Sequence, residues 1–377
     1  MPSDNTEFDD CKDAEAVAAK LNELSGALEE AGVNTDDLSH SSEQLAGKID
    51  TLKKKQGEAA DKAMTFGDKA GQAFNQVHEA IVAAGIAVAL KEIYEYFASC
   101  AQASMDFESA ITGVAKTTDL TDEELAAMSD SIKALSTEIP ATTEEIAAVA
   151  EAAGQPGIQK DALLDFTEIM TMLGTATNMT ADEAATSLAR FANITGMATD
   201  NYGRLGSVIV DLGNNFATTE SEIVAMGTRL ASAGKLAGLT EPEIMALAAA
   251  MSSVGIEAEA GGTAMTQTLN AIEKAVAKGG DDLAEFARIA GMSSEEFSSA
   301  WKNDASSALT SFISGLGKLD EQGESTVLVL EDLGLTGIRQ SNMLKALGLA
   351  ADQMTGAVNT ANTAWQQNTA LTNEANK

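Results

Sequence analysis

The chain has 377 residues, and its 57 acidic and 24 basic side chains give a formal net charge of −33. This excess of negative charge repels phosphate backbones, so we expect no direct nucleic-acid binding. Apolar residues make up 45% of the chain but aromatic residues only 4%, so small aliphatic side chains, chiefly alanine, supply the difference. Because alanine has the highest helix propensity, the composition predicts an all-α fold.

Cysteine usage and the N-terminal sequence narrow the class of protein further. Cys11 and Cys100 are the two cysteines, and neither has a histidine neighbour, which excludes a disulfide framework and makes a zinc site improbable on chemical grounds. The first residues are acidic and contain no apolar core, so no secretory signal is visible. We therefore expect neither a metal nor a cofactor.

The N-terminal part of the chain has helical periodicity. In residues 1–44, an acidic segment predicted to be helical, apolar side chains recur at Val17, Leu21, Leu24 and Leu28. The spacing resumes at Leu45 and continues through 45–110, an Ala-rich stretch. Alternating steps of three and four residues are typical of coiled-coil helices. Alanines and three glycines weaken this repeat, so we expect residues 1–110 to need a partner for stability.

Within that stretch, the spacing of apolar residues predicts an amphipathic helix over residues 80–107. Its apolar positions include Val82, Ile86, Leu90 and Ile93. Its longest apolar run, 80–90, is shorter than the about 20 residues of a membrane span. Two interpretations stay open: the helix packs on a protein neighbour, or it enters a membrane.

Residues 111–350 predict a multi-helix globular core of short capped helices. Six times a Thr or Ser precedes a Glu by three residues at the start of an apolar stretch, which is the capping-box pattern. Four glycines follow such stretches, where a left-handed residue would end the helix. The starts are Thr121, Thr142, Thr180, Thr219, Thr240 and Ser293, and the glycines are Gly154, Gly196, Gly234 and Gly255.

The segments that begin at Thr142, Thr219 and Thr240 look alike, so they are either loose internal repeats or similar capped helices without a repeat. Large apolar residues should let the core close on itself. Residues 351–377 form a polar tail, expected to start a longer helical region, with Trp365 as its one aromatic residue. The expected core residues are Phe166, Phe191, Ile209, Phe286, Trp301 and Phe312.

No arrangement of residues suggests catalysis. His40 lies in a polar stretch, and His78 is followed by Glu79, which points away from it on a helix. Carboxylate pairs that could suggest a glycosidase all fall in a first helical turn, where capping explains them. Phosphate-binding, HExxH and calcium-loop motifs are absent from the sequence. We expect a protein that is not an enzyme, with no catalytic, cofactor-binding or metal-binding residues.

The sequence from Met105 to Val114, MDFESAITGV, is similar to the start of the core region of phage tail tape measure proteins. Residues 136–146, STEIPATTEEI, resemble the next capped helix of that family, and 151–158, EAAGQPGI, resemble the turn after it. Residues 216–219 and 260–264 match two further elements, so the resemblance covers about 45–350. The order and spacing of these elements, more than any one of them, carry the resemblance.

The resemblance implies a structural role in tail assembly, length determination and genome ejection, in a phage or prophage. It implies the tail lumen as location, with the host cytoplasm during assembly. The implied partners are tube proteins, assembly chaperones, distal tail proteins and further copies of the chain, with host-membrane contact through 80–107 as an open addition. The alternatives are a membrane-active helical protein and a helical interaction scaffold without phage context.

Overall fold

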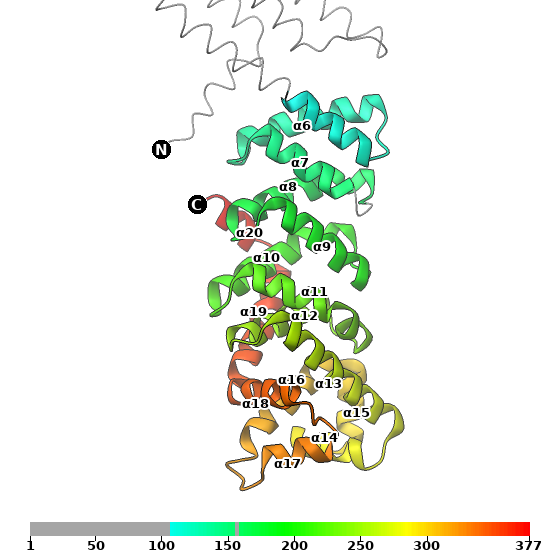
Figure 1. Cartoon of the computed structure of the whole chain (residues 1–377), viewed down its shortest axis with the longest axis vertical. Coiled ribbons are helices and arrows are strands. Elements are labelled where there is room, and N and C mark those ends of the chain that lie inside the picture. The colour runs from blue at the N-terminus through cyan, green and yellow to red at the C-terminus, as the bar shows by residue number, and fades with distance from the viewer. Residues whose placement is uncertain (1–105, 155–157) are drawn as a thin grey trace, which may run out of the picture. The chain divides into compact units, whose positions relative to one another are not determined.

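The computed structural model describes residues 106–154 and 158–377 (Figure 1). The chain divides into two compact units, Met1–Gly113 and Val114–Lys377. The predictions for 1–44, for the coiled-coil stretch up to residue 105 and for most of the 80–107 helix lie outside the described residues. Within the described part every regular element is helical, which confirms the all-α prediction and the multi-helix core.

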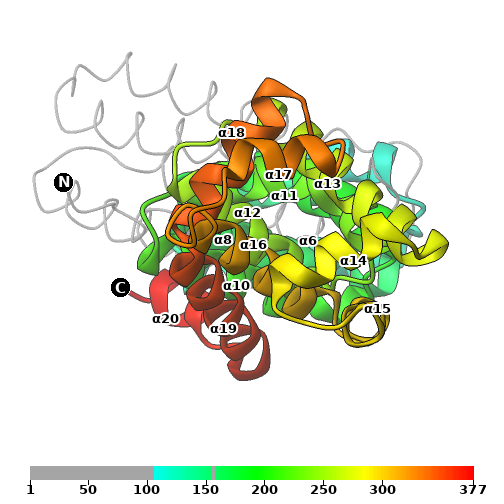
Figure 2. The same cartoon turned by 90° about the horizontal axis from the view of Figure 1, so that it is seen from below.

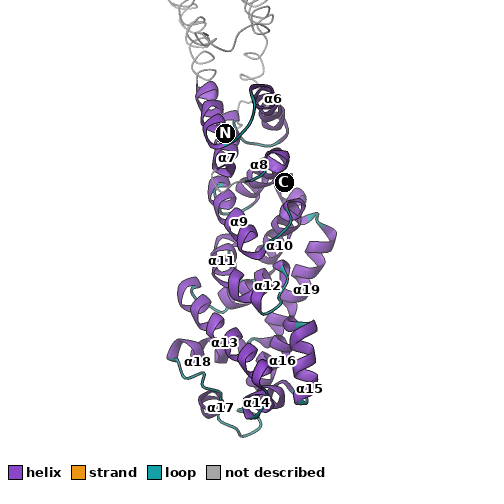
Figure 3. Ribbon diagram, turned by 90° about the vertical axis from the view of Figure 1, so that its right-hand side faces the viewer, coloured by secondary structure: helices purple, strands orange, loops and turns teal. Residues whose placement is uncertain are grey.

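The first eight helices of the second unit form two alternating rows. One row contains α6 (Asp122–Glu138), α8 (Lys160–Ala176), α10 (Tyr202–Asn215) and α12 (Glu241–Ser253), with the short 3₁₀ turn η1 (Thr199–Asn201) before α10. The other contains α7 (Thr143–Gly154), α9 (Ala181–Thr195), α11 (Glu220–Leu236) and α13 (Ala258–Lys278). Each helix packs on the next member of its own row. Figures 1 and 3 show the resulting stack.

This stack is an α-solenoid with a regular repeat. The helices of the second row begin at residues 143, 181, 220 and 258, in steps of 38, 39 and 38 residues. A repeat of about 40 residues with two helices is typical of solenoids, in which each pair buries its apolar face against its neighbours. The segments that begin at Thr142, Thr180 and Thr219 therefore occupy equivalent positions in the repeat. Thr240, in contrast, starts a helix of the other row.

The helix starts agree with the sequence at all six predicted capping boxes. At α9 the Thr180 hydroxyl accepts from the Glu183 amide at 3.2 Å, and the Glu183 carboxylate accepts from the Thr180 amide at 3.0 Å. The same reciprocal bonds occur at α6, α7, α11 and α15 (Ser294–Asn303). At α12 the return bond is 2.8 Å long. Local sequence alone therefore fixes where these helices begin.

One of the four predicted glycine stops is wrong, and a second ends its helix without the expected left-handed conformation. Gly196 and Gly255 are left-handed, with φ of 70° and 80°. Gly154 is the last residue of α7 and Gly234 lies inside α11, which continues to Leu236. At Gly234 the missing side chain gives room to Ile244 of α12, and the left-handed residue comes later, at Gly238. Gly234 is explained by the close packing of two helices, which the hydrophobic periodicity of the sequence does not reveal.

A second group of helices follows the solenoid: α14 (Asp281–Ala290), α15, α16 (Ala305–Lys318), α17 (Thr326–Asp332) and α18 (Ile338–Leu349). Here α14, α15 and α16 pack on one another, as Figure 2 shows from below. An aromatic cluster joins them, with the Phe286 and Phe312 ring centroids 5.1 Å apart. All six expected core residues are at most 3% exposed.

The C-terminal residues differ most from expectation. Instead of a polar tail, they form α19 (Ala351–Gln367) and α20 (Ala370–Ala375), which pack back on α8, α10 and α12 (Figures 1 and 3). The buried side of α19 consists of Met354, Ala357, Ala361 and Ala364. Small side chains such as alanine contribute little to the hydrophobic periodicity of a sequence, but they allow two helices to approach each other closely.

Candidate functional site

A hollow with a volume of about 700 Å³ lies between α16 and α19. The C-terminal end of α14 and the first turn of α12 bound it. Its lining is mostly hydroxyl and amide side chains, with few apolar groups. The residues of α16 and α19 that line it include Ser306, Ser307, Thr310, Ser311, Ser314, Thr355, Asn359 and Asn362.

The hydroxyl groups on α16 differ from those on α8. In α8, Thr167 and Thr171 each donate to the carbonyl one turn earlier, at 2.7 and 2.8 Å. The hydroxyls of Ser306, Thr310 and Ser311 form no hydrogen bond to any described residue, although Ser306 is only 3% exposed. They are available to water or to a polar ligand, and the two carboxylates that line the hollow, Glu243 and Asp304, each accept a hydrogen bond from a backbone amide at a helix start.

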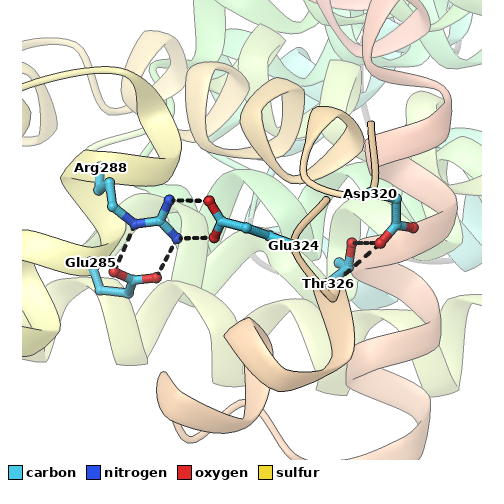
Figure 4. Close-up of polar contacts among 5 residues, drawn as sticks. All are labelled: Glu285, Arg288, Asp320, Glu324 and Thr326. Atoms are coloured by element: carbon cyan, nitrogen blue, oxygen red, sulfur yellow. Dashed lines mark hydrogen bonds and ion pairs between the residues drawn. The ribbon is translucent and has the colours of Figure 1, made fainter. Parts of the chain in front are cut away.

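Arg288, at the edge of this hollow, fastens the loop before α17 (Figure 4). Its Nε and Nη2 donate to Glu285 at 2.9 and 2.7 Å, and its Nη1 and Nη2 donate to Glu324 at 3.1 and 2.9 Å. The guanidinium lowers the pKa of Glu285, and the two carboxylates raise the pKa of Arg288. Four of the five guanidinium N–H groups donate to carboxylates, so the cluster is a structural clasp.

A second contact holds the other end of the same loop. Asp320 accepts from the Thr326 hydroxyl at 3.0 Å and from the Thr326 amide at 3.3 Å (Figure 4). Thr326 is the first residue of α17, so this carboxylate caps that short helix. The loop 319–325 is thereby pinned at both ends.

The carboxylate pairs Glu123–Glu124, Glu144–Glu145 and Glu295–Glu296 occupy helix starts, as expected. Glu124 caps α6 and also forms an ion pair with Lys160 at the start of α8. The hydrogen bond from Lys160, followed by the one from the Thr121 amide, lowers the pKa of Glu124 to about 2. One member of each pair is therefore engaged in capping, which disfavours a catalytic carboxylate pair.

Other residues singled out from the sequence lie outside the described part, namely Cys11, Cys100, His40 and His78. Among residues 106–154 and 158–377, no cluster of three His, Cys, Asp or Glu could hold a metal ion. In the same ranges no helix has the length and apolarity to cross a membrane.

Contacts of α19–α20 with α10 were missed by the sequence analysis. Arg204 donates to the Trp365 carbonyl at 2.7 Å, and the Leu371 amide donates to the Ser207 hydroxyl at 3.4 Å. Asn368, between the two helices, is left-handed with φ of 50°. Asparagine tolerates this conformation and commonly ends helices, so Asn368 was the one readable sign of a turn there.

A family model described as phage-related minor tail protein matches residues 129–333, which is more than half of the chain. The matched residues run from within α6 to the end of α17, and they do not include α18, α19 or α20. Neither the comparison with curated proteins nor the comparison with solved structures gives a match.

Proposed function

The chain belongs to the family of phage-related minor tail proteins, and on this basis we propose that it is a structural tail protein of the tape measure type. In this proposal the chain occupies the tail lumen, acts in assembly and length determination, and leaves ahead of the genome. The observation that carries the proposal is the family match over the solenoid. The alternative of a helical scaffold without phage context conflicts with the family membership.

Charge and shape support a place along the path of DNA. The net charge of −33 gives a surface that DNA does not bind, which suits a protein that must be displaced without retaining the genome. Membership of a structural tail family supports a non-enzymatic role. The solenoid offers extended helix faces to protein partners, as this architecture does in general.

The proposed partners are tube proteins, assembly chaperones, distal tail proteins and other copies of this chain. Host-membrane contact through residues 80–107 is the remaining part of the proposal. Leakage of dye from liposomes by the full chain would support that contact if Ile86→Asp abolishes it. Leakage that Ile86→Asp leaves unchanged, or no leakage at all, would remove it.

Tail length tests the ruler function directly. Residues 45–104 are predicted to be helical, so deleting these 60 residues in frame should shorten the tail by about 90 Å at ~1.5 Å per residue. Thr219→Ala is the matched control, because it weakens a helix cap without changing the number of residues, and it should leave tail length unchanged. Electron micrographs of normal-length tails from the deletion phage would refute length determination.

A further inference from the structure

The junction of α18 and α19 has no local cause for a bend. Ala350 is the single residue between Leu349 and Ala351, and it caps the end of one helix and the start of the next. Its φ and ψ are −113° and 29°, outside the left-handed region. Elsewhere helices end at left-handed glycines, as at Gly196 and Gly291. A Leu-Ala-Ala sequence favours uninterrupted helix, so the local preference opposes the observed bend.

Tertiary contacts therefore hold the bend. They are made by the arm, which we define as α19 and α20 (residues 351–375). Met354, Ala357, Ala361 and Ala364 bury one side of α19 against α10 and α12. Leu371 of α20 is 3% exposed and packs on Gly206, where an added Cβ would lie 2.9 Å from the Leu371 Cδ2. The arm fits closely on the solenoid face formed by α8, α10 and α12, and a second copy of the chain carries an identical arm.

The bent arrangement leaves apolar surface uncovered on α18. Ile338 is 81% exposed and Leu349 is 85% exposed. These residues are eleven positions apart, about three helical turns, so they lie on the same side of the helix. Within residues 106–154 and 158–377, no side chain of the same copy covers this pair.

The family match separates the arm from the face on which it packs. The face consists of α8, α10 and α12, all inside residues 129–333, whereas the arm begins at residue 351. The docking face is thus part of the shared core, whereas the arm lies outside it and is joined to α18 through Ala350.

We propose that the arm is exchanged between copies of the chain. When Ala350 becomes helical, residues 338–367 form one helix of about 45 Å at ~1.5 Å per residue, and the arm leaves its own solenoid. The arm of one copy then occupies the α8, α10 and α12 face of a second copy. Exchange re-forms the arm contacts with α8, α10 and α12, which makes it a low-cost route to association. The favoured partner of this face is therefore a second copy of the same chain.

Cross-linking between two separately tagged full-length chains tests the proposal. Both carry Cys11→Ser and Cys100→Ser, one carries Gly206→Cys and the other carries Leu371→Cys. After mixing and oxidation, exchange produces a disulfide between the two tags, detected by mass on a non-reducing gel. A single chain with both cysteines should give the intramolecular disulfide and show that the pair can bond.

Two controls make the result specific. Mixed chains carrying Gly234→Cys and Ile244→Cys, neighbours inside the solenoid, should give no cross-link between tags. Ala350→Gly disfavours the straight helix by about 1 kcal/mol, so it should reduce the arm cross-link about fivefold. If the double-cysteine chain forms its intramolecular disulfide and the mixed chains form no disulfide between tags, arm exchange is overturned. A mixed product that Ala350→Gly leaves undiminished overturns the helical hinge.

Discussion

Gly315→Ala should destabilise the protein although it raises helix propensity. Gly315 lies inside α16, where alanine would stabilise the helix by about 1 kcal/mol if the space were open. The space is filled by backbone: an added Cβ would overlap the Ile289 carbonyl oxygen at the end of α14. Because that atom cannot rotate away, α14 and α16 must separate and disturb the packing of Phe286 on Phe312.

Overpacking costs about 1–3 kcal/mol, and an overlap with a fixed backbone atom belongs to the upper part of that range, about 2–3 kcal/mol. After the propensity gain of about 1 kcal/mol, we expect a net loss of about 1–2 kcal/mol. At about 2–4 °C per kcal/mol, the Tm of the 114–377 unit should fall by several degrees in a calorimetric or circular-dichroism melt. Gly356→Ala in α19 is the matched control. Its Cβ would make only an ordinary 3.6 Å contact with Phe216, so it should raise the Tm.

Opposite signs for the two alanine variants are the central expectation. If Gly315→Ala melts at or above the unsubstituted protein while Gly356→Ala behaves as described, then α14 and α16 do not approach at backbone distance. The packing argument for that glycine would then fail, whatever the behaviour of the rest of the fold.

Three further expectations follow from contacts described above. Thr219→Ala should lower the free energy of unfolding by about 0.5–2 kcal/mol in a denaturant titration, and no change would mean that the α11 cap is unimportant. The Glu124 pKa of about 2 is below its usual 4.5, so its stabilising contribution is present above pH 4.5 and is lost as the pH falls through about 2. In a carboxyl NMR titration, Lys160→Ala should move that midpoint upward, and an unmoved midpoint would contradict the ion pair. A 114–350 fragment lacks the buried residues of α19 and α20, so it should melt lower and less cooperatively than 114–377, against the expectation that 111–350 is self-sufficient.

The Arg288 clasp shows why a local sequence cannot reveal every contact. Glu285 and Arg288 are three residues apart on one helix, which a reader of the sequence can pair. Glu324 is 36 residues away, and only the path of the loop before α17 brings it to the same guanidinium. The hollow between α16 and α19 cannot be predicted from the sequence for the same reason, because the two helices that line it are distant in sequence.

By itself the sequence determined the helical class, six helix starts and the large core residues. These features depend on neighbours within about one turn, where a Thr or Ser and a Glu three residues later satisfy exposed amides, and on the burial of large apolar groups. The tertiary structure decided the two-row stack, the stop of α11 beyond Gly234 and the return of α19–α20 across α10. At those places the chain follows the fit of small side chains between helices, Gly234 under Ile244 and Gly206 under Leu371. Small residues favour close packing but do not specify which helix packs against them. Only the tertiary structure could therefore identify the helices that they bring together.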